Sequence, residues 1–197
     1  MEIKKSVIAG MMICIASVLY VIVDNHIIGA IMFAFGLLSV FELKLNLITG
    51  KAVDYRSYSL RQMTIYLMGN IIGCIIITLL SLCSAKSVSI NEDAYNLCMS
   101  KFSIGYFNIF CSGVLCGILM AIAVRVNQLG TNNITKTFVV IICIACFILI
   151  GGEHCIADIS YMMLGTYITI ESAIKILIII LGNMLGSIII GEIYGYN

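Results

Sequence analysis

Residues 68–77 read Met-Gly-Asn-Ile-Ile-Gly-Cys-Ile-Ile-Ile, and residues 181–190 read Leu-Gly-Asn-Met-Leu-Gly-Ser-Ile-Ile-Ile. The two stretches share the pattern GNxxG followed by isoleucines. One interpretation is a packing motif in which small residues let membrane helices approach closely. Another is an internal repeat, with one copy in each half of the chain. The two interpretations are compatible. The apolar runs around the two copies provide evidence on whether the chain contains an internal repeat.

Composition favours a protein that lies almost entirely within a lipid bilayer. Of 197 residues, 61% are hydrophobic and 11% are charged, and the mean hydropathy is +1.12. Soluble domains carry about 25% charged residues. The net charge of +1 gives no indication of a nucleic-acid partner. We therefore predict a single transmembrane domain over residues 1–197.

The distribution of apolar residues predicts an all-α fold with six transmembrane helices, since one crossing takes about 20 apolar residues. Two runs, the second and the fifth, are short and stop at polar or charged residues. Irregular backbone at membrane depth survives only where protein or a water-filled cavity surrounds it. We therefore expect the second and fifth helices to be broken, with the breaks facing a pathway. The six runs are 6–23, 27–41, 60–83, 104–124, 137–152 and 172–191.

The two GNxxG copies fall in the third and sixth of these runs. Each half, about residues 1–90 and 100–197, then holds three crossings with a broken middle one. An odd number of crossings per half places the halves in opposite orientations. This is the inverted-repeat plan of transporters, in which the site lies where the broken helices meet.

Basic residues predict the orientation in the membrane. The run that follows Met1 continues past Tyr20 without a small-residue cleavage pattern, so it is interpreted as the first crossing rather than as a signal peptide. With six crossings, one side collects a clear excess of lysine and arginine, whereas the charges on the other side are mixed. Cytoplasmic N- and C-termini are therefore predicted. The residues concerned are Lys4, Lys5, Arg56, Arg61, Arg125 and Lys136.

The nine cysteines do not indicate a metal site. Most lie within apolar runs, where cysteine behaves as a small hydrophobic residue. The chain has no CxxC motif with a second matched pair, so neither a metal nor another cofactor is predicted. Cys83 and Cys98 flank one polar loop, and a disulfide between them would require that loop to face an oxidising compartment.

Glu153 and His154 are adjacent ionisable residues at the second break. An ionisable residue within a membrane is costly and is by default a functional hypothesis. A neutral imidazole can donate a hydrogen bond to an anion, and an imidazolium can give it a proton. Glu153 is expected to orient the break by accepting backbone N–H bonds. The alternative for His154 is a buried, satisfied histidine without a role in transport.

Two further polar residues fit a pathway. The hydroxyl of Thr49, at the first break, could face His154 across a pore and help to coordinate a small solute, or it could cap the following half-helix. Lys101 lies just outside the fourth run and could attract anions. The alternative for Lys101 is a snorkelling lysine at a helix end.

Four stretches carry a resemblance to a known family. They are GGEHCIAD at 151–158, LITG at 47–50, SGVLCG at 112–117 and GNMLG at 182–186. In this arrangement they are similar to the G-F-E-H-x-x-A-N, L-F-T-x, G-I-L-x-N and G-N-I-I-G stretches of the formate/nitrite transporter family. These are pentameric channels for small monovalent anions, so the resemblance implies a homopentamer with an aquaporin-like inverted repeat.

The resemblance also implies a pore with two apolar constrictions. Phe33 and Phe147 correspond to the outer constriction, and Leu37 and Ile48 to the inner one. An apolar constriction opposes a hydrated ion, because removing water from a charge costs several kcal/mol or more. A weak acid that is protonated near the constriction would pass more easily, so electroneutral or proton-coupled transport is expected.

The remaining assignments describe the pore itself. The resemblance makes His154 the central histidine with Thr49 as its partner, and it makes Lys101 a vestibule lysine. The residues expected to line the pore or contact the substrate are His154, Thr49, Glu153, Lys101 and Asn183.

Several positions depart from the family pattern. Gly117 stands where the family has asparagine, which is expected to remove an amide from the pore. Asp158 replaces the asparagine of G-F-E-H-x-x-A-N and adds a negative charge that could repel anions. Gly152 replaces an aromatic residue. The segment at 50–60 is shorter than its counterpart in the family, so the substrate does not follow from the resemblance alone.

The sequence therefore predicts a multi-pass channel or transporter of the cytoplasmic membrane, and no enzyme. Its substrate would be a small monovalent anion or the conjugate acid, such as formate, nitrite, hydrosulfide or a short carboxylate, with protons as a further partner. One alternative is an aquaporin-like pore for a neutral solute. Another is a membrane-embedded redox or metal enzyme that uses His154, Cys155 and Glu153. A third is a non-conducting homologue in which residues 50–60 close the pore.

Overall fold

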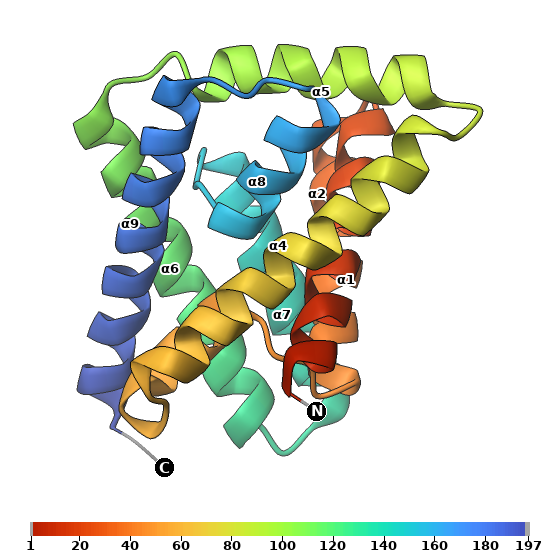
Figure 1. Ribbon diagram of the computed structural model, residues 1–197. Coiled ribbons are helices and arrows are strands. Elements are labelled where there is room, and N and C mark those ends of the chain that lie inside the picture. Colours follow the sequence, from red (N-terminus) through yellow and green to blue (C-terminus); the bar gives the residue numbers. More distant parts are fainter. Residues whose placement is uncertain (1, 196–197) are drawn as a thin grey trace.

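The computed structural model describes residues 2–195, and within this range the chain is helical, without strands. Figure 1 shows the helices, with α5 across one end of the molecule and both termini at the opposite end. These ends are called the α5 end and the terminal end below. In chain order the elements are α1 (Glu2–Ile22), α2 (His26–Glu42), α3 (Ile48–Lys51), the 3-10 helix η1 (Ala52–Ser57), α4 (Leu60–Leu82), α5 (Ser87–Lys101), α6 (Tyr106–Leu129), α7 (Asn133–Leu149), α8 (Cys155–Leu164) and α9 (Ile170–Tyr194).

Four helices of the described part, α1, α4, α6 and α9, are long and apolar enough to cross a membrane. Helices α2, α7 and α8 are apolar but shorter. The long helices present large apolar side chains outward, among them Leu79 and Leu80 on α4 and Leu177 and Leu181 on α9, each more than 60% exposed. In water such surfaces would favour association or aggregation, whereas lipid chains can cover them.

The long helices form two tightly packed pairs, α1 with α4 and α6 with α9. In Figure 1, α6 and α9 run alongside each other. A Cβ atom added to Gly10 on α1 would lie 2.0 Å from the carbonyl oxygen of Asn70 on α4. A Cβ atom added to Gly117 on α6 would lie 2.3 Å from the carbonyl oxygen of Asn183 on α9. Only glycine allows the two backbones to approach this closely.

The expectation that Gly117 leaves a pore position without an amide is therefore wrong. The position faces the backbone of α9, and any side chain there would collide with it. Gly10 has the same relation to Asn70 that Gly117 has to Asn183. Sequence comparison identified the residue type at this position but not the direction in which it points.

Two irregular segments interrupt the apolar helices. Residues 43–47 separate α2 from α3, and residues 150–154 separate α7 from α8. Lys44 in the first segment has φ 51°, and Gly151 in the second has φ 74°. These left-handed conformations turn the chain before each short helix begins, and glycine adopts them at no steric cost.

The region expected to be a polar loop after the third apolar run is mostly helix α5. Its buried face consists of residues four positions apart, namely Ile90, Ala94 and Cys98. This apolar stripe is narrow, and polar residues surround it in the sequence. Cys83 is exposed and Cys98 is buried, and both are free thiols. The disulfide considered above between these two cysteines is not formed.

The Gly117 contact gives a first prediction. We expect Gly117→Ala to lower the free energy of unfolding by about 1–3 kcal/mol, because the added methyl group forces α6 and α9 apart. Unfolding in mixed micelles of a mild detergent and dodecyl sulfate measures the change. Gly105→Ala is the control, since no atom lies within 4 Å of its added Cβ. Equal stability of the two variants would contradict the close packing.

Candidate functional site

Asn70, on α4, fixes the first irregular segment. Its side-chain Oδ1 accepts a hydrogen bond from the backbone N–H of Ile48 at 2.9 Å. Its Nδ2 donates to the carbonyl of Asn46 at 2.9 Å and to that of Ser6 on α1 at 2.8 Å. A side-chain amide offers one oxygen and two N–H donors, so Asn70 uses all three groups on backbone and ties the start of α3 to α1.

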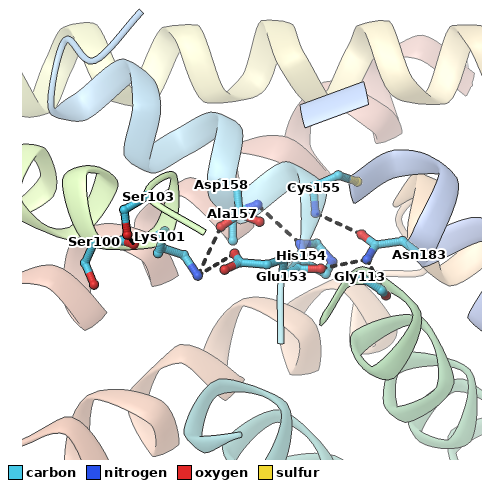
Figure 2. A network of polar contacts seen from close by, with 10 residues as sticks. All are labelled: Ser100, Lys101, Ser103, Gly113, Glu153, His154, Cys155, Ala157, Asp158 and Asn183. Carbon is cyan, nitrogen blue, oxygen red and sulfur yellow. Dashed lines mark hydrogen bonds and ion pairs between the residues drawn. The ribbon is translucent and has the colours of Figure 1, made fainter. Parts of the chain in front are cut away.

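Asn183, on α9, does the same for the second irregular segment. Its Oδ1 accepts from the backbone N–H of Cys155 at 2.9 Å, and its Nδ2 donates to the carbonyls of Glu153 at 2.7 Å and Gly113 at 2.8 Å. Figure 2 shows these bonds converging on the amide. Both N–H donors are engaged, which disfavours the predicted contact between Asn183 and a solute. The asparagine of each GNxxG copy therefore carries a structural task.

His154 and Thr49 meet where the two irregular segments come together. The Nε2 atom of His154 lies 2.9 Å from the hydroxyl oxygen of Thr49, and each residue is 2% exposed. His154 also caps α8, because its Nδ1 accepts the backbone N–H of Ala157 at 3.2 Å. A nitrogen that accepts carries no hydrogen, so in the neutral ring the hydrogen lies on Nε2 and is donated to Thr49.

Aromatic and aliphatic side chains enclose this contact. The rings of Phe33 and Phe147 meet edge to face with centroids 6.1 Å apart, and the ring of Phe147 stacks 6.1 Å from that of His154. Leu37 and Ile48 are 1% and 4% exposed. All four residues lie in the buried apolar core, and their roles as constrictions stay predictions.

Lys101 lies between two carboxylates. Its Nζ is 2.5 Å from Oε2 of Glu153 and 3.4 Å from Oδ1 of Asp158, as drawn in Figure 2. The expectation that Glu153 orients the break through backbone N–H bonds is wrong, because its carboxylate pairs with Lys101 and Asn183 holds the break. The charge of Lys101 is offset rather than free to attract anions. No sequence pattern indicated this ion pair, because its partners lie 52 and 57 positions away.

A small cavity of about 30 Å³ lies between the ring of His154 and the ion pair of Lys101 with Asp158. A water molecule needs about 10–15 Å³ of such space, so the cavity has room for water. Tyr20 and Tyr161 line it and were not singled out from the sequence, although a hydroxyl within an apolar run is a signal that could have found them. The lining includes Tyr20, Lys101, Phe147, His154, Asp158 and Tyr161.

A second cavity, of about 230 Å³, opens near α3 and the end of α6 and is lined by Lys44, Lys51 and Asp54, among others. Beside it Asp54 pairs with Arg125 at 2.7 Å, and Gln128 donates to Asp54 at 3.0 Å. The sequence indicated only an orientation signal for Arg125, yet the residue is 4% exposed and joins the short η1 segment to α6.

Comparison with known proteins decides the family. A family model described as "Formate/nitrite transporter" matches residues 3–196. The chain belongs to the formate/nitrite transporter family. It is accordingly a multi-pass membrane protein with several apolar helices. Membership confirms the resemblance carried by the four sequence stretches.

Curated relatives of this formate/nitrite transporter family member are distant. It is 23% identical over 154 residues to the formate channel FocA of Haemophilus influenzae, covering 72% of this chain and 54% of that protein. It is 22% identical over 187 residues to the formate channel FocA of Escherichia coli K12, covering 83% and 65%. The matched region therefore spans between about half and two thirds of these relatives.

Solved structures show the same fold. A structure titled "Pentameric formate channel with formate bound" superposes with a TM-score of 0.80 at 22% identity, covering 98% of this chain and 92% of that one. An "FNT family ion channel" gives a TM-score of 0.82 at 23% identity, with coverage of 98% and 88%. At such low identity the likeness concerns the fold alone.

The bonds of Asn183 give a second prediction. We expect Asn183→Ala to lower the free energy of unfolding by about 2 kcal/mol or more, because it leaves buried backbone groups without partners. Asn108→Ala on the exposed side of α6 is the control. Unfolding in mixed micelles measures both variants. A stability of Asn183→Ala within error of the control would contradict the role assigned to this amide.

Proposed function

We propose that the chain forms a channel for a small monovalent anion or its conjugate acid, with His154 at its centre. The observation that carries the proposal is the contact between His154 and Thr49 at the meeting point of the two irregular segments. Family membership supports it, and the matched relatives are formate channels by name. Formate is the first candidate substrate, followed by nitrite, hydrosulfide and short carboxylates.

The surroundings of His154 suit a weak hydrogen-bonding substrate. The Nε2–H group that contacts Thr49 could turn to an oxygen of a substrate, and the hydroxyl of Thr49 could follow it. Phe147 and Phe33 enclose this donor in an apolar environment, where an unpaired anion is costly. Passage therefore favours the neutral acid or an anion accompanied by a proton.

The proposed architecture is one transmembrane domain, with half-repeats of about residues 1–90 and 100–197. Helix α2 with α3 would form the broken second crossing, and α7 with α8 the broken fifth crossing of six. The matching amide bonds of Asn70 and Asn183 support an inverted, aquaporin-like repeat. We further propose that the chain forms a homopentamer, which the pentameric solved structure of the same fold supports. The pentamer would lie in the cytoplasmic membrane, with both termini in the cytoplasm and the α5 end outside.

A pore for a neutral solute is the second candidate. It is favoured by the offset charge of Lys101 and by the hydrogen bonds that suit a neutral His154. A redox or metal enzyme has less support, because residues 2–195 hold no group of three or more histidine, cysteine, aspartate or glutamate side chains placed to bind a metal. Closure of the pore by residues 50–60 would give no flux with any solute.

Flux through purified protein in liposomes tests the proposal. Formate uptake in the His154→Phe variant should fall by about tenfold or more, because a hydrogen bond to a charged group contributes about 1.5–3 kcal/mol. His26→Phe is the matched control, since His26 is exposed at the start of α2. Size-exclusion chromatography shows whether each variant is folded. Unchanged flux and pH dependence in His154→Phe would refute the role of this histidine.

Substrate choice needs a separate panel. Uptake of formate, nitrite, hydrosulfide, acetate and lactate is compared at two pH values against that of water and glycerol. We expect the small monovalent acids to pass and uptake to rise at the lower pH. Passage of glycerol without competition from anions would favour the neutral-solute pore. Absence of all flux in a folded protein would indicate the closed homologue.

A further inference from the structure

Asp158 is a buried carboxylate that shares the single ammonium group of Lys101 with a second carboxylate, that of Glu153. Its side chain is 1% exposed, and in the described part of the chain both of its Oδ atoms, like Oε2 of Glu153, lack a hydrogen bond from any neutral donor. The ammonium nitrogen of Lys101 lies 3.4 Å from its Oδ1 atom. It lines the cavity that leads to the ring of His154. A polar group buried in this way is costly and calls for an explanation.

Asp158, Glu153 and Lys101 form a cluster of two carboxylates and one cation, and charge balance in this cluster requires a proton. Glu153 already lies 2.5 Å from Lys101 and is 4% exposed at its side chain, so it takes the closer position on the one ammonium group. Both carboxylates contact the same nitrogen and are therefore neighbours. If both were ionised, one buried negative charge would lack a partner, which protein interiors avoid by binding a proton or an opposite charge.

Among residues 2–195, Lys101 is the one cation that pairs with Asp158. On α9, Lys175 is paired with Glu171 at 2.6 Å. His154 uses Nδ1 to accept the N–H of Ala157, so charging its ring would break the cap of α8. The titratable groups that face Asp158 or its cavity are Tyr20 on α1, Cys98 and Lys101 on α5, Cys116 on α6, and Glu153, His154, Cys155 and Tyr161 in or beside α8.

We propose that Asp158, together with Glu153 and Lys101, holds one proton at the cavity beside His154 and gives it to an arriving weak-acid anion. This inference rests on the proposed function and assigns its proton to a residue. The O–H bond of the Asp158 carboxyl group breaks, and an O–H bond forms on the substrate, which leaves as the neutral acid. A proton from water on the α5 side then restores the carboxyl group through the cavity.

The acidic side chain of Asp158 makes the charge of the cluster depend on pH. An asparagine, as in the similar family stretch, cannot hold a proton there. With Asp158 ionised, the cluster carries a net negative charge that repels the anion. With Asp158 protonated, Glu153 and Lys101 balance each other and the anion can approach. Uptake should therefore follow the protonation of this one side chain.

Comparison of Asp158→Asn with wild type tests the proposal. Formate uptake and proton uptake are measured together in liposomes that contain a pH-sensitive dye, between about pH 5 and pH 8. Wild type should take up about one proton per formate. In Asp158→Asn that ratio should fall, and the ratio of uptake at pH 5 to uptake at pH 8 should drop by about fivefold, because the charge of the cluster no longer changes. Asp93→Asn on the exposed face of α5 is the control and should match wild type.

Infrared spectroscopy provides a readout that does not depend on flux. A protonated carboxyl group gives a carbonyl band that an ionised carboxylate lacks. We expect wild type to show a buried carboxyl band that is absent from Asp158→Asn and retained in Asp93→Asn. If Asp158→Asn does not fold, the pH dependence of this band in wild type replaces it, and a spectrum without a buried carboxyl band overturns the proposal.

The outcomes separate this inference from the function on which it rests. A conducting wild type whose proton-to-formate ratio and pH profile are unchanged by Asp158→Asn overturns the role of Asp158 and leaves the channel intact. A folded wild type that conducts no weak acid overturns the proposed function and the donation step together. In that case the infrared band still decides whether Asp158 holds a proton.

Discussion

The structure depends on two asparagine amides that satisfy backbone groups inside a membrane protein. Hydrocarbon offers no water to an unpaired N–H or C=O group, so an interrupted helix needs partners from elsewhere in the chain. Asn70 makes two bonds at the first irregular segment and one to α1, and Asn183 makes two at the second and one to α6. Without them the chain would have to remain helical at the positions where the site now lies.

These amides also determine where the functional groups are placed. Asn183 holds the carbonyl of Glu153 and the N–H of Cys155, so His154 between them has a fixed backbone. Asn70 holds the N–H of Ile48, next to Thr49. The two side chains can meet at 2.9 Å because both backbones are fixed against long helices. Close approach at Gly10 and Gly117 brings those helices near enough to supply the amides.

The sequence predicted those elements that depend on the pattern of neighbouring residues. Long apolar runs predicted the long helices, and polar residues within short runs indicated where α2 and α7 end. The pairing of Thr49 with His154 was also expected. The sequence did not predict helix α5, because many polar residues obscure its narrow buried face. The prediction that Gly117 faces the pore was wrong, because the type of a residue does not define which neighbour its helix face meets.

Taken alone, the sequence determined the membrane class, the family and the approximate positions of the irregular segments. Hydrophobicity and short motifs are properties of neighbouring residues, so they can be read along the chain. Only the tertiary structure decided that Asn183 binds backbone groups, and that the two buried carboxylates of Glu153 and Asp158 share the one ammonium group of Lys101. Charge balance and hydrogen-bond satisfaction are sums over all groups that folding brings together, and no local pattern contains them.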